Sequence, residues 1–185
     1  MAPQPASVTG AILAGGAGRR MGGTSKALVE LDGRPLAAIV AQTLAEVCDP
    51  VAIVCKPDTE VPDLPGIERW DEPPEPRHPV TGIVHALERA GGPVLVCAVD
   101  MPWVTADACR SLLEAASDRP AAVAVAAGTL CPVFGVYAPA ALEAMRGAAD
   151  GAPLRETVAA LDPTRVALPP ALLRSVNAPE DLVSA

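Results

Sequence analysis

A glycine-rich stretch after a short apolar run is the feature that most constrains this chain. Residues 8–13 are mostly apolar, and residues 14–26 hold five glycines together with Arg19, Arg20 and Lys26. Glycine lets a backbone adopt positive φ and approach a ligand closely. Successive N–H groups in such a loop cradle anions, and cations add charge where a polyphosphate would lie. The pattern predicts a buried strand and a phosphate-binding loop. An ordinary strand-to-helix turn is the alternative, which the three cations disfavour.

Two better-known glycine loops do not fit this stretch. The dinucleotide fingerprint needs glycines at relative positions one, three and six, but Met21 stands at the sixth position after Gly16 and Gly18. The P-loop needs glycine, lysine and then serine or threonine, whereas Lys26 is preceded by Ser25. The loop therefore belongs to another class of phosphate site.

Composition excludes several kinds of partner and favours one compartment. The 14 basic and 22 acidic residues give a net charge of −8, which disfavours non-specific binding to nucleic acid or to an anionic membrane. No apolar run reaches membrane-spanning length, and residues 1–9 lack the charged and apolar regions of a secretory signal. The five cysteines are odd in number and form no Cys-x-x-Cys pair, which favours reduced thiols in the cytoplasm over disulfides or a zinc site.

Apolar runs alternate with segments of helical periodicity along the whole chain. Strands are expected at residues 8–13, 51–55, 67–70, 94–99, 121–126, 131–137 and 164–168, and helices at 36–47, 80–90, 105–116, 138–145 and 154–161. A local hairpin is expected within residues 123–137. This alternation predicts an α/β fold with a mostly parallel sheet and helices on both faces. We expect a single domain over residues 1–185, with residues 1–6 as a flexible N-terminal extension.

Two aspartates follow predicted strands on the side where such sheets bind ligands. Asp71 comes after the strand at residues 67–70, and Asp100 comes after the strand at residues 94–99. Ligands of open α/β sheets lie beyond the carboxyl ends of the strands. A carboxylate there can hold Mg²⁺ against phosphate oxygens. Asp100 could instead cap a turn near Pro102, but its position opposite the glycine loop favours the metal role.

The glycine loop resembles the signature of a known family, the MobA-like nucleotidyltransferases, which include the molybdenum cofactor guanylyltransferases. The residues that carry this resemblance are Leu13, Ala14, Gly15, Gly16, Arg20, Met21, Gly22, Gly23 and Lys26. Asp100-Met101-Pro102 resembles the metal motif of the same family. The resemblance implies a Rossmann-like sheet of the kind found in nucleotide-diphospho-sugar transferases.

The loop and the resemblance together suggest roles for individual residues. Lys26 and Asp100 are expected to be catalytic, with Asp100 binding Mg²⁺ or, alternatively, Mn²⁺. The nucleotide is expected to contact Leu13, Ala14, Gly15, Gly16, Gly18, Arg19, Lys26, Asp71 and Asp100. Because many cytidylyl and uridylyl relatives carry alanine where this chain has Gly15, the resemblance favours GTP over CTP and ATP.

Two further stretches resemble the acceptor side of the family. Residues 78–82 resemble its acceptor-side motif, with Thr81 and Gly82 as expected contacts, although His78 departs from the pattern. Residues 173–182 resemble its pterin-lining segment through Asn177. Asn177 could alternatively satisfy only a turn before a proline. The chain departs from the family pattern at Ser175, which replaces asparagine, and at Cys131, which replaces histidine.

The resemblance implies transfer of GMP from GTP to the terminal phosphate of molybdopterin, with release of pyrophosphate. Molybdenum-insertion proteins and molybdoenzyme chaperones would then be partners. A related nucleotidyltransferase that uses CTP or another phosphorylated acceptor is the alternative. A nucleotide- or pterin-binding protein without turnover is the third interpretation, which Lys26 and Asp100 argue against. The end of the predicted second strand also departs from the family, because Lys56 follows it in place of asparagine.

Overall fold

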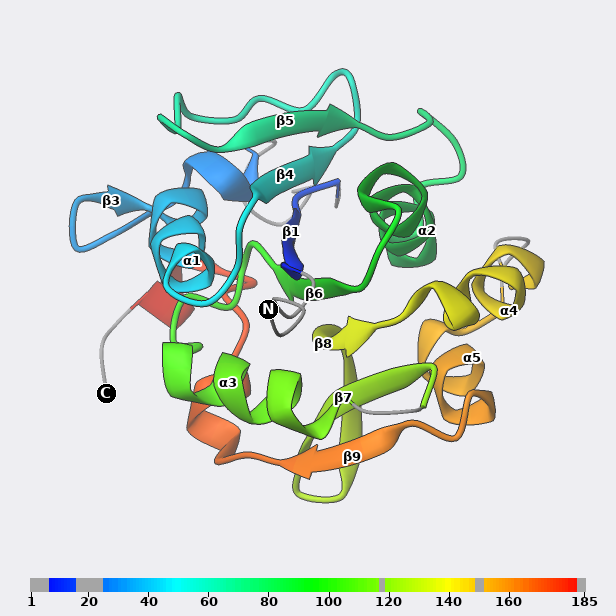
Figure 1. Ribbon diagram of the computed structural model, residues 1–185. Helices are drawn as coiled ribbons and strands as arrows, with labels where there is room; N and C mark the ends of the chain where they lie inside the picture. Colours follow the sequence, from blue (N-terminus) through cyan, green and yellow to red (C-terminus); the bar gives the residue numbers. More distant parts are fainter. Residues whose placement is uncertain (1–6, 16–24, 117–118, 149–151, 183–185) are drawn as a thin grey trace, which may run out of the picture.

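A twisted seven-stranded sheet runs through the centre of the molecule (Figure 1). The computed structural model describes residues 7–15, 25–116, 119–148 and 152–182. Within these ranges the strand order is β5-β4-β1-β6-β8-β7-β9. The strands are β1 (Thr9–Leu13), β4 (Val51–Cys55), β5 (Glu68–Asp71), β6 (Val94–Ala98), β7 (Ala121–Ala126), β8 (Thr129–Tyr137) and β9 (Thr164–Ala167).

The sheet is mostly parallel, as the sequence predicts. β5, β4, β1 and β6 pair in parallel, and β9 pairs in parallel with β7. β8 pairs antiparallel with both β6 and β7. β7 and β8 form the expected hairpin, whose turn residues Ala127 and Gly128 both have positive φ, 47° and 79°. That geometry matches the right-handed twist of the flanking strands.

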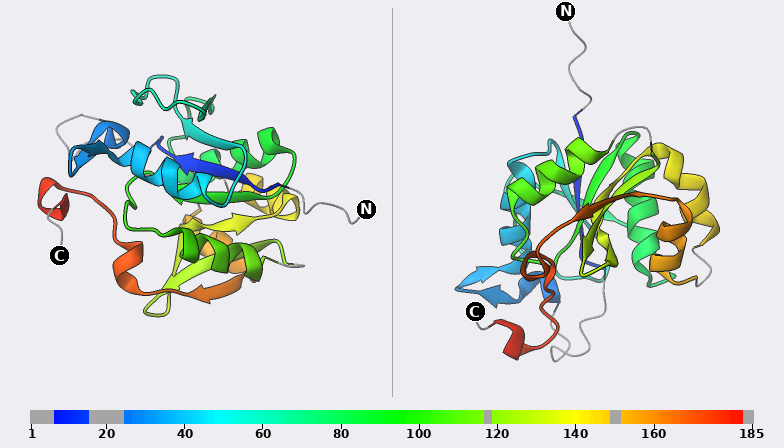
Figure 2. Two further views of the ribbon diagram at one scale, coloured as in Figure 1. Left: turned by 60° about the vertical axis from the view of Figure 1, so that its left-hand side comes forward. Right: turned by 90° about the horizontal axis from the view of Figure 1, so that it is seen from below.

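Helices cover both faces of the sheet (Figures 1 and 2). α1 (Leu36–Ala45) and α3 (Ala106–Ala115) pack on one face, and α2 (Pro79–Ala90), α4 (Leu142–Gly147) and α5 (Leu154–Ala160) on the other. The two faces follow from strand alternation, because successive side chains of a strand point to opposite sides. In β4, Ile53 belongs to the core under α1 and α3, whereas Val54 belongs to the core under α2.

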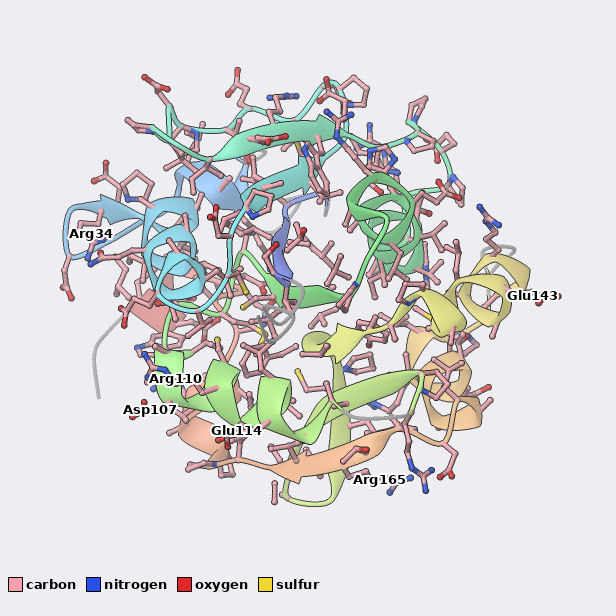
Figure 3. The ribbon with its side chains drawn as sticks, viewed as in Figure 1. Arg34, Asp107, Arg110, Glu114, Glu143 and Arg165 are labelled. Atoms are coloured by element: carbon pink, nitrogen blue, oxygen red, sulfur yellow. The ribbon has the colours of Figure 1, made fainter. Side chains whose placement is uncertain are left out.

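The core is mostly aliphatic, and its buried aromatic side chains in the described ranges are Trp70 of β5 and the chain's single Phe and single Tyr, both in β8. Phe134 and Tyr137 lie on opposite faces of the sheet, and the Tyr137 hydroxyl donates a hydrogen bond to the carbonyl of Pro132 at 2.5 Å. Most charged side chains lie outside this core. Those labelled in Figure 3 point away from the molecule and are exposed. No helix in the described ranges is both long and apolar enough to span a bilayer.

Several short elements differ from the sequence-based expectation. β2 (Glu30–Leu31) and β3 (Arg34–Pro35) form a small hairpin, with Asp32 and Gly33 at its turn, where only the turn is evident from the sequence. Strands of two residues are too short to show an alternating pattern. The helix expected at residues 138–145 begins as a 3-10 turn, η3 (Pro139–Ala141), before α4. Further 3-10 turns are η2 (Lys26–Leu28), η4 (Pro170–Leu173) and η5 (Pro179–Leu182).

We expect Gly135→Ala to destabilise the fold. A Cβ at Gly135 would lie 2.8 Å from the carbonyl oxygen of Ala122, at a point where the β7–β8 register shifts between Val123 and Ala124. Overpacking of this kind costs about 1–3 kcal/mol in the free energy of unfolding. Urea denaturation measures it. Gly147→Ala is the control, because a Cβ there meets no atom within 4 Å; equal stability of the two variants would contradict the expectation.

Candidate active site

A cavity of about 270 Å³ lies beyond the carboxyl ends of β1, β5 and β6, beside the first turn of α2. This is where open α/β sheets bind ligands. The ends of β1 and β6 and the start of α2 supply most of its wall, and polar side chains reach it from several loops. Its lining residues are Leu13, Ala14, Gly15, Lys26, Glu72, Arg77, His78, Pro79, Gly82, Ala98, Val99, Asp100, Val133 and Ser175.

Backbone hydrogen bonds extend the sheet one residue beyond its strands at this edge. Ala14 N–H donates to Val54 C=O at 2.9 Å, and Val99 N–H donates to Leu13 C=O at 3.0 Å. Glu72 N–H donates to Cys55 C=O at 2.9 Å, so β5 also continues past its last strand residue. The first loop residues around the cavity therefore have fixed backbone positions.

Lys26, Asp100 and Asn177 meet at one end of the cavity. The Lys26 Nζ lies 2.6 Å from Asp100 Oδ2 and donates a second hydrogen bond to Asn177 Oδ1 at 2.9 Å. The side chains of Lys26 and Asp100 are 20% and 18% exposed, so a ligand can reach both. Three residues that the sequence assigns to phosphate, metal and acceptor thus form a single cluster.

The segment that carries Asn177 is tied to the loop after β6. Val176 is fully buried and its N–H donates to Asp100 C=O at 2.8 Å. Asp181 Oδ2 accepts hydrogen bonds from the N–H groups of Asn177 and Ala178, at 2.8 and 2.9 Å. These two bonds lower the pKa of the Asp181 carboxyl. Asp181 is not among the residues predicted from the sequence, although an acid in the first turn after Pro179 is a capping signal.

The structure separates Asp71 from the cavity and brings Glu72 into it. Asp71 is 53% exposed and accepts a hydrogen bond from Arg69 Nε at 2.8 Å. Strand alternation explains the exchange, because Glu72 shares a face with Trp70, which is buried under α2. Asp71 and Arg69 share the opposite, solvent-facing side. The structure therefore does not place Asp71 at the cavity, where the sequence predicts it. The buried carboxylate at the cavity belongs to the next residue, Glu72.

Glu72 pairs with an almost completely buried lysine. The Glu72 side chain is 4% exposed and the Lys56 side chain 1%, and Lys56 Nζ lies 3.5 Å from Glu72 Oε2. Lys56 donates its hydrogen bonds elsewhere, to the carbonyls of Pro73 at 2.6 Å and Pro76 at 2.9 Å. Burial raises the pKa of the Glu72 carboxyl, and the nearby Lys56 and Arg77 charges oppose that rise.

The backbone of Gly15 lies directly against this carboxylate. A Cβ built on Gly15 would overlap Glu72 Oε1, closer than any Cβ packs in a protein. From the resemblance, Gly15 is expected to contact the nucleotide and to favour GTP. In the structure the space beside Gly15 holds the Glu72 side chain.

The remaining predicted residues divide into three groups. Gly82 lines the cavity, and so do Leu13 and Ala14. Thr81 is buried and its hydroxyl donates to Pro76 C=O at 3.2 Å, so that its side chain supports the loop rather than lining the cavity. Gly16, Gly18 and Arg19 lie outside the described residues.

Asp100, which the sequence predicts to bind a metal ion, lines the cavity as a partly exposed carboxylate. In the described ranges no three His, Cys, Asp or Glu side chains converge in the way that an all-protein metal site requires. Mg²⁺ needs no such cluster, because it commonly binds through one or two carboxylates together with substrate phosphates and water. A single, partly exposed carboxylate at the cavity is compatible with that mode.

We expect Asp181→Ala to loosen the segment that carries Asn177. The amide protons of Asn177 and Ala178 should exchange roughly 3- to 10-fold faster at neutral pH, because a capping carboxylate is lost. Glu180→Ala is the matched control, since Glu180 is exposed and the Asp181 carboxylate makes both bonds. Because the folded-state pKa of Asp181 is lowered, its contribution is present at neutral pH and is lost as the pH falls through that pKa. Unchanged exchange in Asp181→Ala would contradict this role.

Two solved structures share the fold over nearly the whole chain. Molybdopterin-guanine dinucleotide biosynthesis protein A from Archaeoglobus fulgidus superposes with a TM-score of 0.73, at 22% identity and 95% coverage of both chains. The 2-C-methyl-D-erythritol 4-phosphate cytidylyltransferase from Thermus thermophilus gives a TM-score of 0.71, again at 22% identity and 95% coverage of both chains. At this level of identity the likeness establishes the fold alone.

Relatives of higher identity are guanylyltransferases by name. A molybdenum cofactor guanylyltransferase from Cereibacter sphaeroides is 37% identical over 186 residues, covering 95% of this chain and 94% of that protein. A probable molybdenum cofactor guanylyltransferase from Natronomonas pharaonis is 34% identical over 138 residues, covering 71% of this chain and 68% of that protein. The family model of the MobA-like NTP transferase domain matches residues 10–165. With the cavity at the expected sheet edge, this match shows that the chain belongs to the MobA-like NTP transferase family.

Proposed function

We propose that this protein transfers GMP from GTP to the terminal phosphate of molybdopterin, forming the guanine dinucleotide cofactor and releasing pyrophosphate. The convergence of Lys26, Asp100 and Asn177 at one end of the cavity carries the proposal. The names of the relatives from Cereibacter sphaeroides and Natronomonas pharaonis support the choice of substrates. Molybdenum-insertion proteins or molybdoenzyme chaperones would receive or hand over the cofactor.

The reaction joins two phosphates and needs charge more than covalent chemistry. An oxygen of the acceptor phosphate attacks the α-phosphorus of the nucleotide, and the bond to the pyrophosphate oxygen breaks. Positioning and neutralisation of charge dominate such a step. Lys26 supplies a positive charge that Asp100 and Asn177 hold in place. When a triphosphate occupies the cavity, its oxygens would compete with Asp100 for the Lys26 ammonium.

Asp100 would then be free to hold Mg²⁺, or Mn²⁺ in its place. A divalent ion bound there would neutralise phosphate charge and orient the α-phosphate. The Asn177 amide oxygen lies close to this position, 2.9 Å from the Lys26 ammonium nitrogen. The Lys26 ammonium would thus face the negatively charged phosphate oxygens, and the oxygens of Asp100 and Asn177 would face the cation.

The acceptor side differs from the family pattern at two described positions. Ser175 lines the cavity in place of the family's asparagine, so a hydroxyl replaces an amide there. Cys131 is partly buried in β8, and burial raises the pKa of its thiol, which keeps it neutral. These differences keep open a second candidate function, transfer from CTP or to another phosphorylated acceptor. The cytidylyltransferase fold of the Thermus thermophilus structure is compatible with it.

A panel of nucleotides and acceptors tests the proposal. We expect pyrophosphate release with GTP and molybdopterin in the presence of Mg²⁺, and GTP to be preferred over CTP and ATP by roughly 30-fold or more, as for two unpaired polar groups in a mismatched site. A preference for CTP would favour the second candidate. Tight binding of nucleotide without pyrophosphate release in every mixture would indicate a binding protein instead.

We expect Asp100→Asn to fold normally and to slow turnover by about 100-fold or more, because one carboxylate at a phosphoryl centre contributes several kcal/mol. Lys26→Met should raise the KM for the nucleotide and also lower kcat. Asp107→Asn is the matched control, since Asp107 is 92% exposed and points away from the molecule (Figure 3). Turnover of Asp100→Asn within a few-fold of the unmodified enzyme would remove Asp100 from the mechanism.

A further inference from the structure

Glu72 presents a buried acceptor at the cavity that the described structure leaves unsatisfied. The side chain is 4% exposed and lines the cavity, and Oε2 has no hydrogen-bond partner among the described residues. Buried polar atoms are nearly always hydrogen-bonded in native proteins, and an exception calls for an explanation. A ligand that donates to Glu72 supplies one.

Lys56 holds this carboxylate in place without satisfying it. Two of the three ammonium protons of Lys56 are committed to Pro73 C=O and Pro76 C=O. The Nζ–Oε2 separation of 3.5 Å makes an ion pair that is longer than a charge-assisted hydrogen bond. Lys56 is therefore a positioning residue: its charge stabilises the ionised carboxylate, and its hydrogen bonds fix the loop that follows Glu72.

Two glycines leave the carboxylate open to the cavity. Glu72 Oε1 occupies the space where a Cβ of Gly15 would lie, and Oε2 would stand 3.5 Å from a Cβ of Gly82. Both glycines line the cavity, together with the apolar side chain of Leu13. The carboxylate thus sits between two backbone surfaces that carry no side chain. Asp100, the partner of Lys26, follows β6, and β4 and β1 lie between β6 and the strand β5 that Glu72 follows.

Among nucleobases, guanine matches a carboxylate best. Its N1–H and N2–H₂ groups are neighbouring donors on one edge, and a carboxylate has two acceptor oxygens at a matching separation. Adenine and cytosine present a ring nitrogen acceptor beside an amino donor, so one carboxylate oxygen would face a lone pair. We propose that Glu72 selects guanine by accepting hydrogen bonds from N1–H and N2–H₂. The inference rests on the proposed function, because it assigns the base end of the nucleotide in that same site.

Equilibrium binding by calorimetry tests the inference, with GTP, ITP, ATP and CTP as probes in the presence of Mg²⁺. ITP keeps N1–H and lacks the N2 amino group. Unmodified protein should bind GTP more tightly than ITP by on the order of 10-fold or more, the effect of one hydrogen bond to a charged group. Glu72→Gln keeps the side-chain volume. It should weaken GTP binding by at least the same factor and bring GTP and ITP within a few-fold of each other. Glu60→Gln changes an exposed glutamate and should behave as the unmodified protein.

The outcomes separate this inference from the proposed function. Equal binding of GTP and ITP by the unmodified protein overturns it, and that measurement does not depend on any variant folding. Retention of the full GTP preference in Glu72→Gln also overturns it, as does loss of the preference in Asp71→Asn alone. If the protein releases pyrophosphate from GTP while Glu72→Gln keeps its preference, the function stands and the inference fails. If GTP binds selectively through Glu72 but no acceptor yields pyrophosphate, the inference stands and the proposed function fails.

Discussion

The parallel alignment of β5, β4, β1 and β6 is the constraint on which the site depends. Parallel strands end at a common edge, so residues far apart in the sequence arrive at one place. The loop after β1, Glu72 after β5 and Asp100 after β6 all follow from that alignment. The backbone hydrogen bonds of Ala14, Glu72 and Val99 extend the sheet by one residue, so that the cavity wall is fixed by the sheet itself. The positions of these groups are thus set by the most ordered part of the molecule.

The Lys56–Glu72 pair is the costly element of this arrangement. Removing two charges from water is expensive, and their attraction offsets the cost only when geometry and additional hydrogen bonds are good. Lys56 has its carbonyl partners, whereas one oxygen of Glu72 has none among the described residues. A buried ion pair with one unsatisfied member is poorly explained by stability alone. A buried acceptor without a partner calls for an explanation, and the proposed bound base supplies one, which would place the pair with the site rather than with the core.

The alternation of apolar runs and helical periods was enough to predict the sheet and its covering helices. β4 lies at the residues expected for it, and the β7–β8 hairpin falls where a hairpin was predicted. The position of Asp100 opposite the glycine loop also followed from two strand ends on one edge, whereas its contact with the Lys26 ammonium is seen only in the structure. Asp71 shows where this reasoning stops, because a residue's face depends on the strand's register. Burial of Trp70 sets that register, and alternation from Trp70 would have pointed to Glu72. Lys56 was identified only as a departure from the family pattern. Its neighbours in the sequence do not indicate that it pairs with Glu72, which lies beyond the proline-containing segment that follows it.

The C-terminal segment, residues 170–182, is attached to the protein by fewer buried side chains than the rest of the site. Lys26 and Asn177 are 151 residues apart in the sequence, and in residues 170–182 Val176 is the one buried side chain. In Figure 2 the segment lies beside the β2–β3 hairpin, where Val176 and Leu182 pack with Leu31. Its other apolar contacts are partly buried, such as those of Leu172 and Leu173 with the main core. Segments with few buried side chains open locally at a lower free energy than global unfolding. Heating or mild denaturant would therefore detach Asn177 from Lys26 while the sheet stays intact. The temperature at which the Lys26–Asn177 contact is lost would then be set by this segment rather than by the melting of the fold.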